Sequence, residues 1–216
     1  MYPWHKRFFQ TTRGRLVALL RRRPSTVDEL ATELGVTDNA VRAQLTTLER
    51  DGLVEQRGVR RGAGKPSHAF GLTAAFEPTL SQAYAPLLVQ LLRELGGRLR
   101  PQELSDLLRA VGRRWASELP AVGGSLPERA AAAAALLEQL GGAVELGKSA
   151  GEGPAVVTVR GFGCPVGLAV GEEPKVCAAL ETVLGAITGL EVKECCERGT
   201  GAPSCRFELR DPSATG

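Results

Sequence analysis

Apolar positions at helical spacing predict three short helices in the first fifty residues. The first covers residues 12–22. Thr26 and Glu29 have the spacing of a capping box, which predicts the start of a second helix. Gly35 ends that helix, because glycine adopts a left-handed backbone at low cost. Thr37 can then cap a third helix.

Two segments rich in β-forming residues follow, at residues 54–59 and 68–72, and a glycine-containing turn joins them. They predict a β-hairpin. Two short helices connected by a tight turn are the sequence form of a helix-turn-helix, and a hairpin directly after them is a wing. The pattern therefore predicts a winged helix-turn-helix over residues 1–73.

The rest of the chain changes character at about residue 141. Helical patterns cover residues 80–95, 101–119 and 128–140, and the glycines at 96 and 97 are expected to end the first of them. Strands are predicted at 143–146, 155–159, 191–193 and 206–209, and a helix at 174–190. We therefore expect an α+β protein with three parts: the winged helix (1–73), a helical linker and dimerisation segment (74–141) and a small α+β domain (142–216).

Charge is distributed unevenly along the chain. Residues 1–72 contain 13 Lys and Arg against 7 Asp and Glu, whereas the remainder contains 14 against 17. A basic first part is typical of a protein that meets a polyanion. No apolar run reaches the length of a membrane span, and the first residues lack the apolar core of a secretory signal, so we expect a cytoplasmic protein without a membrane partner.

The third predicted helix has two distinct faces. Val41, Leu45 and Leu48 fall on one stripe that must face a core. The opposite face carries the residues that we expect to meet the DNA, which are Asn39, Arg42, Ala43, Thr46 and Arg50. Asparagine pairs with adenine, arginine with guanine, and the methyl groups of alanine and threonine suit thymine. The late position of Arg50 favours a phosphate contact.

The predicted hairpin is strongly basic. It holds Arg57, Arg60, Arg61 and Lys65 with no acidic residue between them. A polar helix face alone is as consistent with ordinary solvation as with DNA binding. A cationic turn directly after a helix-turn-helix favours phosphate or minor-groove contacts, so we interpret the two surfaces together as a DNA-binding face.

These residues resemble a known family. The run from Thr26 to Val54, with Gly35-Val36-Thr37 between the two helices and Gly64-Lys65-Pro66-Ser67 in the wing, is similar to winged-helix regulators of the ArsR/DeoR type. The resemblance covers roughly residues 12–73. It implies a homodimer that reads a palindromic operator, with residues 80–95 as a dimerisation helix. Burial of that helix inside its own chain is the alternative.

All five cysteines lie in the last part of the chain, at positions 164, 177, 195, 196 and 205. Clustering of this kind in a reducing compartment favours metal or redox chemistry over a structural disulfide. Four thiolates suit zinc or an iron–sulfur cluster. Buried apolar cysteine is the alternative for any single position. Cys177 is expected in the first turn of a helix, where the positive end of the helix dipole favours a thiolate.

A second resemblance narrows these alternatives. Cys164-Pro165, a spacing of twelve residues to Cys177, and a glycine-rich turn before Cys205 are similar to the SufR group of iron–sulfur repressors. The resemblance implies a 4Fe-4S or 2Fe-2S cluster on Cys164, Cys177 and Cys205. The pattern of the group does not determine the fourth ligand, for which this chain offers Cys196, with Cys195 as the alternative. In that group, cluster binding in the C-terminal half controls DNA binding.

Three alternatives remain open at this point. The cysteines could hold zinc, or they could act as a thiol–disulfide switch. The segment from Cys196 to Phe207 is also similar to the end of 4-vinyl reductase domains, which implies a module that senses small molecules. No Ser/His/Asp set, paired catalytic carboxylates or phosphate-binding loop is recognisable, so we do not expect an enzyme.

Overall fold

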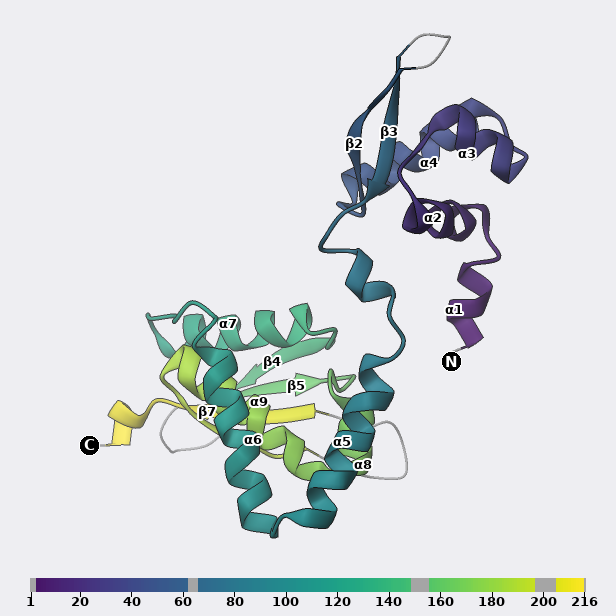
Figure 1. Ribbon diagram of the computed structural model, residues 1–216. Helices are drawn as coiled ribbons and strands as arrows, with labels where there is room; N and C mark the ends of the chain where they lie inside the picture. The colour runs from purple at the N-terminus through teal and green to yellow at the C-terminus, as the bar shows by residue number, and fades with distance from the viewer. Residues whose placement is uncertain (1–2, 62–65, 149–155, 197–204, 216) are drawn as a thin grey trace. The chain divides into compact units, whose positions relative to one another are not determined.

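A computed structural model describes residues 3–61, 66–148, 156–196 and 205–215. The chain divides into two compact units, Met1–Tyr84 and Ala85–Gly216 (Figure 1). The predicted α+β fold class is confirmed. Among the described residues, no helix is long and apolar enough to cross a membrane.

The first unit consists of short helices packed against a small sheet. Its elements are α1 (Pro3–Phe8), α2 (Thr12–Arg22), β1 (Ser25–Thr26), α3 (Val27–Leu34), α4 (Asp38–Arg50), β2 (Val54–Arg60), β3 (Ser67–Leu72) and the 3-10 helix η1 (Glu77–Leu80). The strands are antiparallel in the order β1-β3-β2. The three helices and the hairpin predicted from the sequence are therefore present. The pairing of β1 with β3 was not predicted, because two residues are too few to show alternation.

Local signals explain where these helices begin and end. The Thr26 hydroxyl accepts a hydrogen bond from the Glu29 N–H, and the Glu29 carboxylate accepts one from the Thr26 N–H at 2.8 Å, which completes the capping box. Gly35 ends α3 in the left-handed conformation, with φ of 70°. The Thr37 hydroxyl caps α4 by accepting from the Ala40 N–H. The core holds α4 through the predicted residues Val41, Leu45 and Leu48.

The second unit is a four-stranded antiparallel sheet with helices. Its elements are α5 (Tyr84–Arg98), α6 (Pro101–Ala116), α7 (Leu126–Gln139), β4 (Val144–Lys148), β5 (Val156–Gly161), α8 (Gly167–Glu172), η2 (Pro174–Val176), α9 (Cys177–Thr188), β6 (Glu191–Glu194), β7 (Cys205–Arg210) and η3 (Pro212–Thr215). The strand order is β4-β5-β7-β6. Along β7, Cys205, Phe207 and Leu209 are buried while Arg206 and Arg210 are exposed, so one face of the sheet meets the core.

Two clusters of buried residues stabilise this unit. The first, which we name the sheet core, joins α7 and α9 to the strands and includes Leu137, Leu184 and Phe207. The second, which we name the helix core, joins α5, α6 and α8 to the start of α9. Its buried members are Leu92, Leu104, Leu108, Ala169, Val170, Val176 and Cys177.

Several boundaries differ from the sequence prediction. Helix α5 passes through Gly96 and Gly97 and ends at Arg98. The helix predicted from residue 174 begins at Cys177, after the 3-10 turn η2, and the short helix α8 was missed. The helices predicted as a separate segment, residues 74–141, lie mostly in the second unit and share its cores with the sheet.

Candidate functional site

The polar face of α4 is open to solvent. Asn39, Arg42, Ala43, Thr46 and Arg50 are all exposed, while the core residues of the same helix are buried. Arg50 pairs with the neighbouring Asp51, their atoms 3.3 Å apart. Within the part of the chain that the structure describes, Arg42 makes no ion pair. The residues suited to reading bases are therefore available to a partner.

The arginines of the hairpin divide into two kinds. Arg57 pairs with Glu55 at 2.8 Å and donates to the Leu72 carbonyl at 2.7 Å, so its side chain lies along the sheet. Arg60 pairs with Glu29 and donates to the Pro24 carbonyl, which ties it to the start of α3.

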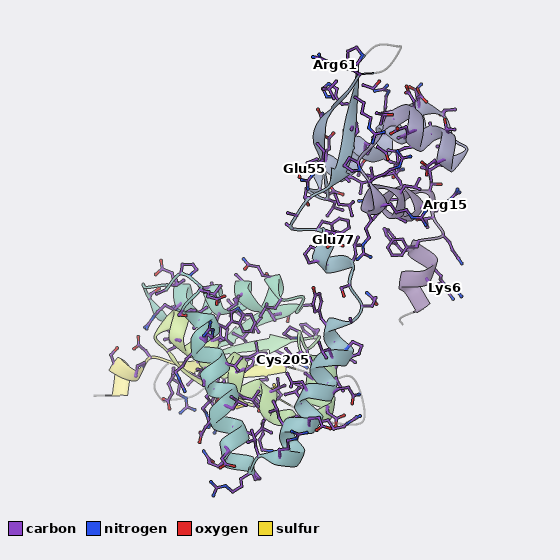
Figure 2. All side chains as sticks on the ribbon, viewed as in Figure 1. Lys6, Arg15, Glu55, Arg61, Glu77 and Cys205 are labelled. Carbon is purple, nitrogen blue, oxygen red and sulfur yellow. The ribbon has the colours of Figure 1, made fainter. Side chains whose placement is uncertain are left out.

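Arg61 instead is exposed and directly follows β2 (Figure 2). The predicted contact residue Lys65 lies outside the described residues.

Four of the five cysteines come together in the second unit. Cys164 precedes α8, Cys177 is the first residue of α9, Cys196 follows β6 and Cys205 begins β7. The Sγ atoms of Cys196 and Cys205 are 3.9 Å apart. The Cys177 thiol forms a hydrogen bond with Cys196, and the Cys164 thiol forms one with Cys205. Figure 2 labels Cys205 beside the sheet.

These contacts shift the pKa values of two neighbouring thiols in opposite directions. Hydrogen bonds from Cys177 and Cys205 lower the pKa of the Cys196 thiol, and the Arg206 N–H, 3.2 Å from its sulfur, also lowers it. Hydrogen bonds with Cys164 and Cys196 raise the pKa of the Cys205 thiol. Of Cys196 and Cys205, Cys196 is therefore the thiol that ionises first.

Cys195 belongs to the other face of the sheet. Its N–H donates to the Arg206 carbonyl at 2.8 Å, which continues the ladder between β6 and β7 by one residue. Successive side chains of a strand point to opposite faces, so Cys195 and Cys196 diverge. Burial, followed by the nearby Glu208 carboxylate, raises the pKa of the Cys195 thiol.

The sequence analysis missed one residue of this site, Glu194. One of its carboxylate oxygens and the Sγ atoms of Cys177 and Cys196 all lie within 4.8 Å of one another. The same carboxylate accepts a hydrogen bond from the Cys196 N–H at 2.7 Å. Alternation along β6 could have indicated this position, but the predicted strand ended at residue 193, so it was not considered.

The cysteine cluster lies where the two cores of the second unit meet. Cys177 and Cys164 pack in the helix core, and Cys205 and Cys196 pack in the sheet core. The helix core also fixes α5, which an ion pair joins to α8: Arg93 Nε lies 2.8 Å from a Glu172 carboxylate oxygen. A change at the cysteines therefore acts on both cores.

Comparison with known proteins bears on the first unit. Residues 10–58 match the family model of the DprA winged helix domain. Among solved structures, a variant of ZitR from Lactococcus lactis is 21% identical, with 49% of this chain and 74% of that chain covered and a TM-score of 0.28. MepR, a transcription regulator of the Staphylococcus aureus multidrug efflux pump MepA, is 19% identical, with 53% and 87% covered and a TM-score of 0.29.

No curated protein matches the chain. The family match begins at residue 10 and ends within β2, so it includes α2, α3 and α4 entire. It agrees with the helix order and the caps described above. The first unit is a winged-helix domain.

Proposed function

We propose that the protein is a transcription regulator that binds operator DNA through the winged helix, with an affinity set by an iron–sulfur cluster in the second unit. The observation that carries the proposal is the meeting of Cys164, Cys177, Cys196 and Cys205. These residues come from four elements and are separated by up to forty residues of sequence, yet their thiols form one chain of contacts.

The four cysteines fit an iron–sulfur cluster. Cys177 and Cys205 are each only 2% exposed, and Cys164 and Cys196 are half-buried, so the site is largely withdrawn from water. Several thiolates placed side by side repel one another strongly in a medium of low polarity, unless protons or metal ions compensate their charge. Iron within a cluster, held by four thiolates, would supply that compensation together with sensitivity to oxidants.

The chain's own packing offers a path from the cysteines to the DNA-binding unit. Cys164 and Cys177 share the helix core with Leu92 of α5, and Arg93 joins α5 to α8. Helix α5 begins at Tyr84, the last residue of the winged-helix unit. Binding of the cluster to the cysteines would therefore hold α5 in place, and α5 would in turn orient the winged-helix unit that precedes it in the chain.

DNA contact is assigned to the exposed face of α4 and the end of the wing. Asn39, Arg42, Ala43 and Thr46 would read base edges, and Arg61, with Lys65, would meet phosphate. Arg50, Arg57 and Arg60 would make no direct contact with bases, since each is already paired with an acidic residue of the same chain. A homodimer on a palindromic operator follows from the single short reading helix in each chain.

Anaerobic purification followed by iron and sulfide analysis tests the cofactor. We expect a coloured protein with equivalent iron and sulfide, and loss of both in Cys196→Ser. Cys195→Ser is the matched control and should keep them. Stoichiometric zinc without sulfide would replace the cluster with zinc. Metal-free protein containing a disulfide would favour a thiol switch, and a bound apolar molecule without metal would favour the 4-vinyl-reductase-like alternative.

A selection from random duplexes, followed by anisotropy titration on the selected sequence, tests the DNA assignment. Arg42→Ala should weaken binding by about 1–3 kcal/mol. Arg22→Ala removes an equal charge from an exposed position of α2 and is the control. Equal losses in the two variants would remove Arg42 from the reading face.

A further inference from the structure

Glu194 occupies a position where a carboxylate is rare. Strand β6 alternates, with Glu191 and Lys193 exposed and Val192 and Glu194 half-buried on the face that meets the core. Cys196 continues that alternation on the same face. A carboxylate that leaves water in this way needs a cation or hydrogen-bond donors to compensate its charge.

The distances around Glu194 match the coordination shell of one metal ion. Its carboxylate oxygen and the sulfurs of Cys177 and Cys196 lie within 4.8 Å of one another. A tetrahedral zinc ion forms bonds of about 2.3 Å to sulfur and about 2.0–2.2 Å to oxygen, which places its ligand atoms about 3.6–3.8 Å apart. The three atoms therefore need to approach one another by about 1 Å at most to share one ion.

The other two thiols of the cluster stand outside this group of three. Cys205 forms hydrogen bonds with Cys164 and with Cys196, and neither Cys164 nor Cys205 belongs to the group around Glu194. One end of the cluster, formed by the sulfurs of Cys177 and Cys196 and a Glu194 oxygen, is thus suited to a single ion. The other end, at Cys164 and Cys205, offers sulfur alone.

We propose that Cys177, Cys196 and Glu194 form a binding site for a single divalent transition-metal ion, which is filled when no iron–sulfur cluster is present. Binding releases the two thiol protons to solvent, and the two thiolates and the carboxylate then surround the ion. Its fourth position is left to water. The inference rests on the same thiol cluster as the proposed function, but it requires neither sulfide nor DNA.

The surrounding hydrogen bonds hold these ligands in place. Glu194 accepts from the Cys196 N–H, which fixes the turn that brings the Cys196 sulfur inward. The Glu194 N–H donates to the Glu181 carboxylate at 3.1 Å. Glu181 lies one turn after Cys177 on α9, so the strand end and the helix start are tied together. Outer-shell bonds of this kind orient metal ligands.

Titration of the cluster-free protein with Co²⁺ under anaerobic conditions tests the site, because thiolate-to-cobalt charge-transfer absorption reports the number of sulfur ligands. Glu194→Gln should raise the Co²⁺ dissociation constant by at least about tenfold. Its amide oxygen can still accept the Cys196 N–H, so the fold is kept. Cys164→Ser and Cys195→Ser are controls and should bind Co²⁺ like the wild type, with equal charge-transfer intensity, whereas Cys177→Ser should halve that intensity.

Two results would overturn the site: wild-type affinity in Glu194→Gln, or a loss of intensity in Cys164→Ser equal to that in Cys177→Ser. Circular dichroism of each metal-free variant checks that it is folded, and X-ray absorption of the zinc-loaded wild type measures the sulfur and oxygen ligands directly if Cys177→Ser does not fold. If Co²⁺ binds as expected but anaerobic protein lacks iron and sulfide, only the proposed cluster fails. If iron and sulfide are present but Glu194 has no effect, only this site fails.

Discussion

At the scale of single residues, the Glu29 carboxylate interacts with three different parts of the winged helix. It accepts the Thr26 N–H, pairs with Arg60 of the wing and lies 3.5 Å from Arg23. The Thr26 backbone hydrogen bond, together with the charges of Arg60 and Arg23, lowers the pKa of the Glu29 carboxyl below 4.5, although burial opposes this shift. One carboxylate thus joins the start of α3 to the base of the wing.

This lowered pKa predicts a pH-dependent contribution to stability. The folded state favours the ionised carboxylate, so the stabilisation is present above the ordinary pKa of 4.5 and is lost as pH falls through the lower folded value. We expect Glu29→Gln to cost about 1 kcal/mol or less at neutral pH, and less in acid. Urea unfolding at several pH values measures both.

Glu33→Gln is the control for this prediction. Glu33 pairs with Arg23 at 2.8 Å but caps no helix and does not reach the wing. Its substitution should have a smaller effect. A loss in Glu29→Gln that stays constant down to acid pH would show that the charge of Glu29 is not what stabilises the domain.

The cysteines show which part of a site a sequence can reveal. Their clustering identified the region, and four of the five do come together. The choice between Cys195 and Cys196 depends on the strand phase at the end of β6, where the predicted strand was too short to cover either residue. Glu194 was missed for the same reason. That Cys196 is a ligand stays a prediction.

At the scale of elements, Gly112 controls how closely α6 and α9 approach. A methyl group at this position would lie 2.5 Å from the Ala179 carbonyl oxygen and 2.8 Å from Thr182 Cβ. Both neighbours belong to α9, and the first is backbone, which cannot rotate away. The side-chain patterns of α6 and α9 give no sign of this contact.

We expect Gly112→Ala to destabilise the second unit by about 1–3 kcal/mol, because the helices must separate. Alanine forms helices better than glycine by about 1 kcal/mol, so any loss means that the steric effect exceeds the helix preference. Gly97→Ala is the matched control: it also lies in a helix, and nothing is within 4 Å of the added methyl group. Thermal unfolding should show stabilisation there, and a gain in Gly112→Ala would contradict the close packing.

Helix α5 carries an exposed apolar stripe. Its members are Tyr84, Leu87, Leu88 and Leu91, which are 63%, 66%, 40% and 52% exposed in the single chain. Their spacing is that of one helix face, and Leu92, which packs in the helix core, lies at the edge of that face, one turn after Leu88. An exposed patch of this kind is typical of an association surface.

Substitution of this stripe should therefore disrupt the proposed homodimer. We expect Leu87→Lys together with Leu91→Lys to yield a monomer by sedimentation velocity, with an unchanged circular dichroism spectrum. Gln90→Lys places the same charge at an exposed polar position of α5 and should leave the dimer intact. A dimer that survives the double substitution would place the interface elsewhere.

Element boundaries were less predictable than elements. Two adjacent glycines normally end a helix, yet α5 continues through both. Leu95 and Leu99 pack against the helix core on either side of them, and the Leu99 N–H bonds the Leu95 carbonyl at 2.9 Å. Packing between distant segments thus outweighed a local signal. The short α8, with two glycines of its own, carried no local signal at all.

At the scale of the whole molecule, the winged helix and the cysteine cluster belong to different units. The first was recognisable from caps, turns and periodicity, which are local. The second unit was not, because α7 shares a cluster of buried residues with β7, which follows it by more than sixty residues. The proposed regulation requires the two units to communicate, and α5 is the element at their boundary.

The ion pair between Arg93 and Glu172 tests that communication. Allosteric coupling between two sites is typically about 1–3 kcal/mol, so cluster-loaded and cluster-free protein should differ by about 5–150-fold in operator affinity. Both side chains of the pair are partly exposed, so solvent weakens their interaction. Arg93→Ala should therefore reduce this ratio without abolishing it, measured by anisotropy on both forms.

Arg98→Ala provides the control for coupling, because Arg98 pairs with Glu94 inside α5 and reaches no other element. It removes the same charge and a more exposed ion pair, and it should leave the ratio unchanged. Equal effects of the two substitutions would mean that α8 does not hold α5 in the regulated state. Because coupling is reciprocal, operator DNA should also change the equilibrium affinity of the protein for the cluster by the same factor, and Arg93→Ala should reduce that change.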